Sequence, residues 1–455
     1  MRYGTRLWAA LLIMILLFSM GMTAMATEGQ ELTPEEQAEE EEKQRVYSLP
    51  VQTAGLTGWP EGPSTYGEAA IVMEVGTGAI LYAKNIDSSY YPASITKILT
   101  TLIALENGSL NDPVAFSADS VSFLEWGDAQ IGMKEGNVIT LEQALYAVLL
   151  ASANEVSYAV AESVGENAGY DYNWFLEQMN VRCGQLGGIN SHFSNPHGLH
   201  AEDHYTCAMD MALITREAFK HPEIFTIMQT LQYRIDASDT TEEHVFQQNH
   251  KMLFPENPNY YEYAIGGKTG FTDQALTTLV TMADNGEMQL VCVTLKTRGG
   301  GHAYPDTRAL LDYAFGNFRK VDVAEAEKSE DVGEIIAQDG MGYVVLPQEV
   351  AFENVDMTVT PDEEVPGEAT LFYTYEANPV GQARATLSEA YIEKHSAKIE
   401  KTQEKEEKDG EKGARKQDIV KWTLIAVLIL LIAMFITVSA RQAVVRKRRQ
   451  RWRRR

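Results

Sequence analysis

The residues with the clearest chemical potential are a serine and a lysine three positions apart, Ser94 and Lys97. Residues at this spacing lie on one face of a helix, so the lysine amine can reach the serine hydroxyl. A serine hydroxyl keeps its proton near neutral pH and becomes a good nucleophile only when a neighbouring base removes that proton. Lysine can be this base where burial or a second cation lowers its pKa. The alternative, a helix-capping serine beside a solvated lysine, explains most isolated matches to so short a pattern.

A second motif, Ser152-Ala153-Asn154, lies between two stretches of helical periodicity. The Ser152 hydroxyl could relay a proton between Lys97 and a leaving amine, and Asn154 could hold Lys97 or a substrate amide. Serine and asparagine also cap helices often, which is the structural alternative.

A third motif, Lys268-Thr269-Gly270, ends a predicted strand that also contains two preceding glycines. Glycine in a strand allows a ligand to approach the backbone closely. A substrate peptide could add to this strand edge as an extra strand, and Lys268 and Thr269 could bind its terminal carboxylate. The alternative is an ordinary strand end with an exposed lysine.

Strands and helices must bring these motifs together. Strands are predicted on both sides of a helical middle region, which indicates an α+β fold with an antiparallel sheet packed against a helical subdomain. The predicted strands are 69–74, 79–83, 263–269, 275–282 and 288–295. The predicted helices are 95–105, 141–150, 155–164, 172–186 and 208–219.

The two ends of the 455-residue chain carry targeting signals. Residues 1–26 combine Arg2 and Arg6 with an apolar run and a small-x-small pattern, which predicts a cleaved signal peptide; a retained membrane anchor is the alternative. Residues 421–440 contain an apolar run long enough for a transmembrane helix. The tail 441–455 holds nine basic and no acidic residues. Since basic residues stay on the cytoplasmic side, we expect a single-pass cell-membrane protein whose bulk is extracytoplasmic.

Composition and pattern divide the remainder of the chain. Residues 27–62 are acidic and poor in aromatics, which predicts disorder. Residues 63–320 carry the three motifs and are expected to form the catalytic domain. Short β-like runs at 342–346, 357–359 and 369–375 predict a small β domain over 321–393. The densely charged segment 394–420 is expected to be a stalk.

Charge and cysteine content exclude some functions. A formal net charge of −26 argues against a nucleic-acid partner. The three cysteines, Cys183, Cys207 and Cys292, match no zinc-binding pattern and are interpreted as core residues. We expect no metal and no cofactor.

Together and in this order, the three motifs resemble those of the penicilloyl-serine transferases, and most closely the D-alanyl-D-alanine carboxypeptidases among the low-molecular-mass penicillin-binding proteins. The resemblance covers roughly residues 66–318 and implies a DD-peptidase/β-lactamase-like fold. It is carried by the stretches 91–97 (YPASITK), 195–199 (NPHGL), 204–206 (HYT) and 267–272 (GKTGFT).

The resemblance implies a role for each catalytic residue. Ser94 would be the acylated nucleophile and Lys97 its proton acceptor. Ser152 and Asn154 would complete the proton network. His197 is expected to shape a loop beside the cleft rather than to act in catalysis.

It also implies how substrate is bound. The substrate-binding residues would be Lys268, Thr269, Gly270 and Phe271, with Lys268 on the substrate carboxylate. The backbone N–H groups of Ser94 and Phe271 would form the oxyanion hole. The implied partners are peptidoglycan stem peptides as substrates and β-lactam antibiotics as acylating inhibitors, with the catalytic domain facing the cell wall.

Two other functions compete with this one. A class A β-lactamase uses a glutamate after the middle motif to activate water, but no glutamate occurs between Glu177 and Glu202. A silent wall-binding scaffold has no need of four intact catalytic side chains. The chain departs from the family at Ala153, at Phe271, in a short second domain, and in a membrane span that replaces an amphipathic C-terminal helix.

Overall fold

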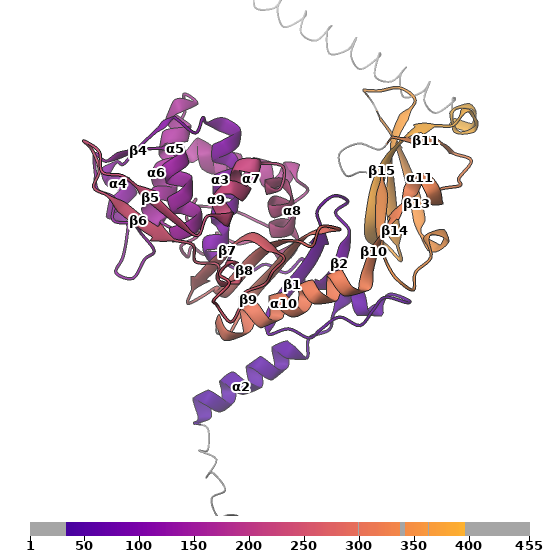
Figure 1. Ribbon diagram of the computed structural model, residues 1–455, viewed down its shortest axis with the longest axis horizontal. Coiled ribbons are helices and arrows are strands. Elements are labelled where there is room, and N and C mark those ends of the chain that lie inside the picture. Colours follow the sequence, from indigo (N-terminus) through magenta and orange to yellow (C-terminus); the bar gives the residue numbers. More distant parts are fainter. Residues whose placement is uncertain (1–32, 299, 337–341, 363, 396–455) are drawn as a thin grey trace, which may run out of the picture. The chain divides into compact units, whose positions relative to one another are not determined.

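The computed structural model describes residues 33–298, 300–336, 342–362 and 364–395, and a five-stranded antiparallel sheet positions the candidate site within them (Figure 1). The strand order is β2-β1-β9-β8-β7. The strands are β1 (Gly67–Glu74), β2 (Ile80–Lys84), β7 (Ala264–Thr272), β8 (Leu276–Asp284) and β9 (Gln289–Thr297). Both hairpins predicted from the sequence, β1–β2 and β8–β9, are confirmed.

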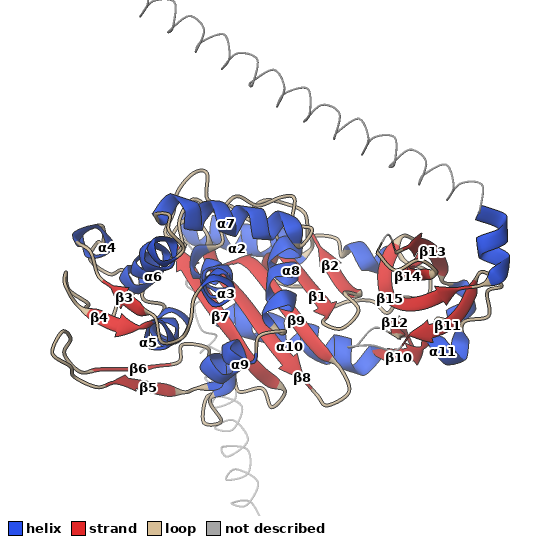
Figure 2. Ribbon diagram, turned by 90° about the horizontal axis from the view of Figure 1, so that it is seen from above, coloured by secondary structure: helices blue, strands red, loops and turns tan. Residues whose placement is uncertain are grey.

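The sheet is covered on both faces, which explains the nearly continuous apolar sequences of its central strands. Helix α10 (Gly300–Asn317) packs along β1, β8 and β9 on one face, and α8 (Ala208–Ala218) packs on β1 and β9 from the other (Figure 2). All eight residues of β1 are buried in consequence. Helix α10 was not predicted from the sequence, because Gly300, Gly301 and Pro305 near its start are typical of turns.

The helical subdomain is built around α3 (Lys97–Asn107), which contacts α6, α7 and α8. Residues 97–104 of α3 are all buried, as expected for a helix at the centre of a core. The neighbouring helices are α4 (Ala118–Ser122), α5 (Leu141–Tyr146), α6 (Asn154–Asn167), α7 (Tyr172–Gln185) and α9 (Pro222–Gln229). Two small hairpins complete it, β3 (Pro113–Ala115) with β4 (Val138–Thr140) and β5 (Gln232–Ile235) with β6 (His244–Gln247). The predicted α+β class is confirmed.

Helix α2 (Pro34–Tyr47) occupies part of the segment for which composition predicted disorder. Its N-terminus has a capping box formed by Thr33 and Glu36. Its C-terminus is fixed because the buried Lys84 amine donates to the Val46 carbonyl at 2.9 Å. The prediction of disorder over 27–62 is therefore wrong for residues 34–47, since local capping and one buried contact outweigh the acidic composition.

The described chain divides into two compact units. Of the described residues, the first unit holds those up to 326 and those within 337–358 and 371–383. The second unit holds 327–336, the described residues within 359–370, and 384–395. A second sheet has the order β10-β12-β15-β14-β13, with β11 also paired to β15. Its strands are β10 (Phe318–Asp322), β11 (Val332–Ile336), β12 (Tyr343–Pro347), β13 (Asp356–Pro361), β14 (Glu368–Tyr375) and β15 (Asn378–Leu387), and the short helix α11 (Val323–Ala326) follows β10. Strands thus occur where β-like runs were predicted, and the domain boundaries stay a prediction.

The predicted signal peptide, most of the stalk, the transmembrane helix over 421–440 and the basic tail lie outside the described residues. Within the described ranges, no helix is both long and apolar enough to cross a membrane. Cys183, Cys207 and Cys292 are buried and free.

Candidate active site

Ser94 is presented by a tight turn between the sheet and helix α3. It lies in the 3₁₀ turn η2 (Ala93–Thr96), directly after Ala93, whose φ of 51° is left-handed. This conformation costs a non-glycine residue about 1–2 kcal/mol. The preceding carbonyl, of Pro92, accepts a hydrogen bond from the Thr278 hydroxyl of β8 at 2.8 Å. Contacts with the sheet therefore hold the strained turn that exposes Ser94.

Two glycines let other segments touch this turn. A Cβ atom on Gly198 would lie 2.0 Å from the Ala93 carbonyl oxygen, and a Cβ on Gly270 would lie 2.8 Å from the Ser94 nitrogen. Neither separation is sterically tolerable, so any other residue would force the backbone to move. The loop that contains Gly198 and strand β7 consequently pack directly against the nucleophile turn.

Lys97 is fully buried, and its amine contacts three oxygen atoms. Nζ lies 3.0 Å from Ser94 Oγ and 2.7 Å from Asn154 Oδ1, and it also donates to the His197 carbonyl. Burial lowers the pKa of Lys97 well below its usual range, and the nearby Lys268 amine lowers it further. An amine in this environment can be neutral, and hence basic, near neutral pH.

Ser152 enters the site through an irregular end of a helix. The π-helical turn η3 (Ala147–Ala151) precedes it, and Ser152 itself is left-handed with φ 61° and ψ 29°. Such turns and strained residues concentrate at functional sites. Ser152 Oγ accepts a hydrogen bond from Lys268 Nζ at 3.0 Å, and Asn154 then begins α6.

Strand β7 carries the predicted substrate-binding residues and lies at the edge of the sheet. Lys268 is 1% exposed, and its amine also donates to the Thr269 carbonyl at 2.9 Å. Burial lowers the pKa of Lys268 to about 7. Side chains alternate along a strand, so Lys268 and Gly270 face the nucleophile turn, whereas Phe271, 64% exposed, points to solvent.

The structure therefore gathers the predicted catalytic residues into two hydrogen-bonded groups. The first joins Ser94, Lys97 and Asn154, and the second joins Ser152 and Lys268. The groups are linked by the short stretch of chain from Ser152 to Asn154 and by the electrostatic effect of Lys268 on Lys97.

The loop 194–206 contacts Lys97 through a main-chain carbonyl, and two of its side chains pack beside the site. The His197 ring stacks on Phe123 with centroids 4.9 Å apart, and burial lowers its pKa well below the usual range. His204 Nε2 lies 2.9 Å from the Thr96 hydroxyl, and burial lowers the pKa of His204 to about 3. Both rings are therefore neutral packing groups. The contact of the His197 carbonyl with Lys97 was not predicted, since a sequence pattern of side chains does not indicate a main-chain contact.

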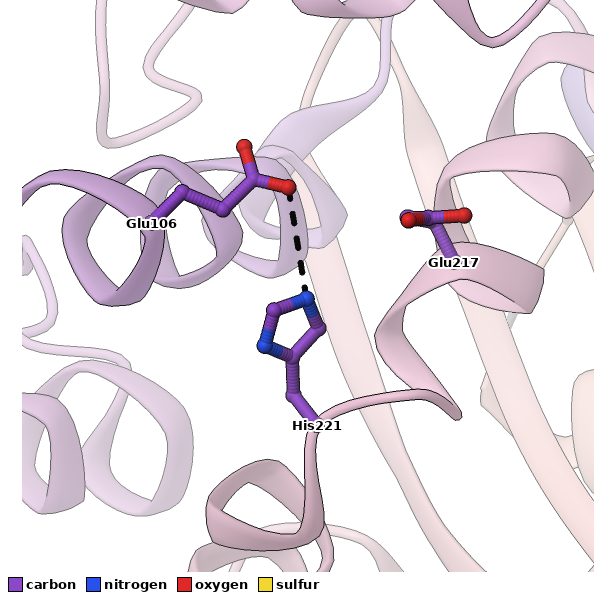
Figure 3. A group of neighbouring side chains, drawn as sticks. All are labelled: Glu106, Glu217 and His221. Carbon is purple, nitrogen blue, oxygen red and sulfur yellow. Dashed lines mark ion pairs between the residues drawn. The ribbon is translucent and has the colours of Figure 1, made fainter.

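One cluster of potential metal ligands occurs among the residues that the structure describes, formed by Glu106, Glu217 and His221 (Figure 3). Arg182 bridges the two carboxylates, at 2.7 Å to Glu106 and 2.8 Å to Glu217. Glu106 also lies nine residues beyond Lys97 on α3, or about 13 Å along the helix. We interpret the cluster as an ion-pair network between helices, separate from the candidate active site.

Comparison with known proteins agrees with this geometry. Residues 59–299 match the model of the D-alanyl-D-alanine carboxypeptidase family. The chain is 30% identical to the D-alanyl-D-alanine carboxypeptidase DacB2 of Mycobacterium tuberculosis, over 58% of this chain and 87% of that relative. It is also 30% identical to DacF of Bacillus subtilis, over 55% of this chain and 62% of the relative. The match thus spans less than two thirds of the Bacillus subtilis protein.

Solved structures show the same fold. A Streptomyces DD-transpeptidase superimposes with a TM-score of 0.51 at 24% identity, over 56% of this chain and all of that structure. A D-alanyl-D-alanine carboxypeptidase from Mycobacterium tuberculosis gives a TM-score of 0.50 at 28% identity, over 59% and 96% of the two chains. The matched sequence, the shared fold and the site geometry lead to one conclusion: this chain belongs to the D-alanyl-D-alanine carboxypeptidase family of serine peptidases.

Proposed function

We propose that the protein is a serine-type D-Ala-D-Ala carboxypeptidase that removes the C-terminal D-alanine from peptidoglycan pentapeptides through an acyl-enzyme on Ser94. The observation that carries this proposal is the buried Lys97 amine, 3.0 Å from the Ser94 hydroxyl. Such a pair matches a nucleophile and its general base in distance, and the lowering of the Lys97 pKa by burial favours the neutral amine that a base requires.

The hydrogen bonds around Lys97 favour proton transfer from Ser94. Asn154 Oδ1 and the His197 carbonyl can only accept, so they take the two N–H groups of a neutral amine. The remaining lone pair of Nζ then accepts the Ser94 O–H. As Oγ bonds to the carbonyl carbon of the penultimate residue, the Oγ–H bond breaks and its proton moves to Lys97.

The oxyanion that forms in this step would be bound by the N–H groups of Ser94 and Phe271. Support comes from the close packing of β7 on the nucleophile turn at Gly270, which brings the two backbones together. Each such donor supplies roughly 3 kcal/mol of transition-state stabilisation.

Strand β7 would bind the peptide. Its free edge can pair with an extended substrate, and Lys268 with Thr269 would bind the terminal carboxylate. As the C–N bond breaks, Ser152, hydrogen-bonded to Lys268, would give its hydroxyl proton to the nitrogen of the departing D-alanine and take the proton held by Lys97 in exchange. Water would then cleave the ester and regenerate Ser94.

A β-lactam would acylate Ser94 by the same first step, and slow deacylation would make it an inhibitor. The competing β-lactamase function predicts rapid turnover instead. Steady-state hydrolysis of penicillin by the purified protein separates the two, because sustained turnover on the scale of seconds contradicts the carboxypeptidase proposal.

The cellular arrangement in the proposal follows the ends of the sequence. Residues 1–26 would direct secretion, 421–440 would span the cell membrane once, and 441–455 would remain cytoplasmic, so that the catalytic domain faces the cell wall. Treating intact cells with protease tests this topology. The catalytic domain should be cleaved while a tag on the tail survives, and loss of the tag would contradict it.

The central test is mass spectrometry of the full-length protein after incubation with penicillin and with a peptide ending in D-Ala–D-Ala. We expect a covalent adduct on Ser94 and release of D-alanine, both absent from Ser94→Ala. The matched control is Ser88→Ala, an exposed serine six residues earlier, which should retain both activities. A folded wild-type protein that gives neither adduct nor D-alanine would favour the scaffold function.

A further inference from the structure

Glu155 is a fully buried carboxylate to which the mechanism above gives no role. It follows Asn154 in the first turn of α6. Burial of a carboxylate is costly unless its oxygens are hydrogen-bonded or it faces a positive charge. Hydrogen bonds compensate one oxygen of Glu155 and not the other: burial raises the pKa of this carboxyl, and the backbone hydrogen bonds from Ile131 and Gly132 oppose that rise.

One oxygen of Glu155 holds a neighbouring backbone segment. Oε1 accepts hydrogen bonds from the N–H groups of Ile131 at 2.7 Å and Gly132 at 3.1 Å. The N–H of the preceding residue, Asn154, donates to the Ala129 carbonyl at 2.8 Å. Two consecutive residues of α6 therefore fix this segment beside the side chain that contacts the general base.

The other oxygen, Oε2, is buried and has no hydrogen-bond partner among the residues that the structure describes. Its charge is not neutralised by a direct ion pair in that part of the chain, so it can act on nearby cations through a medium of low dielectric constant. The N-terminus of the 14-residue helix α6 favours a negative charge at this position.

The cation that needs a partner is Lys97, which gains a proton during acylation in a dry site. Burial and the neighbouring Lys268 both oppose that charge. The two histidines that interact with Lys97, His197 and His204, are neutral because burial lowers their pKa values. Neither ring can therefore offset the new positive charge.

Two carboxylates favour the charged form of Lys97: Glu155, which is buried, and Asp128, which is partly exposed and therefore screened by solvent. We propose that Glu155 is a positioning residue for acylation, whose carboxylate holds the 131–132 backbone on α6 and stabilises the ammonium group formed on Lys97 when Ser94 is deprotonated. The inference rests on the proposed function, since it takes Lys97 as the base.

The test measures the rate of acylation by a fluorescent penicillin across pH, for the full-length wild type and Glu155→Gln. Glutamine keeps an oxygen acceptor but removes the charge. Loss of a negative neighbour lowers the pKa of Lys97, so the acid limb of the profile should move to lower pH. The weaker base accepts the proton less readily, so the plateau rate should fall roughly tenfold.

A second variant separates the effect of the Glu155 charge from the effect of its hydrogen bonds to the 131–132 backbone. Glu155→Asp keeps the charge on a shorter side chain, so the acid limb should stay in place. Hydrogen exchange at the amides of Ile131 and Gly132 should accelerate in Glu155→Asp more than in Glu155→Gln. The matched control is Glu162→Gln on the same helix, whose carboxylate accepts from the Ser117 hydroxyl and should affect neither limb nor plateau.

The outcomes are distinct. If folded Glu155→Gln has the same acid limb and the same plateau rate as the wild type, the inference is overturned. It is also overturned if the plateau rate falls while the acid limb stays in place, because that result indicates a purely structural role for Glu155. Normal acylation with accumulation of acyl-enzyme would also overturn it, by assigning Glu155 to deacylation. If Glu155→Gln does not fold, a shifted limb in Glu155→Asp overturns it. Absence of acylation in the wild type would instead refute the proposed function.

Discussion

Gly270 of β7 and Ser94 of the nucleophile turn meet backbone to backbone, with no space between them for a side chain. The contact places the edge strand β7, the proposed peptide-binding strand, directly beside Ser94, the proposed nucleophile. The geometry of the site therefore requires glycine at position 270, since even the methyl group of alanine has no space there.

Replacing Gly270 by alanine should abolish most acylation while the protein remains folded. The new Cβ would lie 2.4 Å from the Thr278 hydroxyl and 2.8 Å from the Ser94 nitrogen, so β7 must shift away from the turn. Displacing the oxyanion donors should lower the acylation rate by about 10²–10³-fold. Gly184→Ala on α7, where a Cβ meets nothing within 4 Å, is the control. Retention of more than a tenth of the rate in Gly270→Ala would show that the contact is not critical.

Phe271 should tolerate truncation, in contrast to its neighbour. Its side chain is 64% exposed, and only its backbone N–H is assigned to the oxyanion hole. Phe271→Ala is expected to acylate within about threefold of the wild-type rate, because an exposed apolar side chain contributes little to the buried reaction centre. A loss approaching that of Gly270→Ala would mean that the ring contacts the substrate.

Ser152 allows backbone strain to be separated from hydroxyl chemistry. Both Ser152→Ala and Ser152→Gly lose the hydroxyl that accepts from Lys268, so both should lose catalytic activity to a similar extent. Only glycine relieves the left-handed φ of 61°. Denaturant unfolding should therefore find Ser152→Gly about 1 kcal/mol more stable than Ser152→Ala. Equal stabilities would indicate that the turn stores no strain.

The buried Lys268 should make stability depend on pH. Burial lowers its pKa from 10.5 to about 7, so between these values the unfolded chain binds a proton that the folded chain does not. The free energy of unfolding should rise with pH in this window, by at most roughly 1.4 kcal/mol per pH unit. Lys268→Met lacks this contribution. The free energy of unfolding of both proteins can be measured in denaturant from pH 7 to pH 10. The difference in this free energy, wild type minus variant, should grow with pH. A difference that stays constant would contradict the lowered pKa of Lys268.

Much of the site was predictable because its central pair is local. Ser94 and Lys97 are three residues apart at a helix start, and helix geometry alone predicts their contact. The contact between Lys268 and Ser152 spans more than a hundred residues and was not predicted, since the sequence associated Ser152 with Lys97 and Lys268 with the substrate carboxylate. The fold class was predictable for a similar reason, since the short apolar runs of the sheet strands and the periodicity of α6 to α8 are local signals.

The remaining features depend on contacts that no local pattern reports. The apolar run 141–150 is typical of one helix, yet it passes into a π-helical turn just before Ser152, which contacts Lys268. Glu155 reads as an ordinary acidic residue in a first helical turn, and its burial is set by the segment 129–132, which carries no recognisable motif. Helix α2 was missed because its stability comes from a cap and from Lys84 rather than from an apolar face.

In the proposed complex, in which Lys268 binds the substrate carboxylate, the near-neutral pKa of Lys268 would couple substrate binding to protons in solution. At pH 7 the amine is about half protonated. A substrate carboxylate arriving beside it favours the ammonium form, so the complex takes up a fraction of a proton from the buffer. The heat of binding measured by calorimetry will therefore include the ionisation enthalpy of the buffer, and affinity for the peptide will decline as the medium becomes alkaline. Under the proposed function, the burial of Lys268 would therefore make the affinity for the peptide depend on the pH of the surroundings.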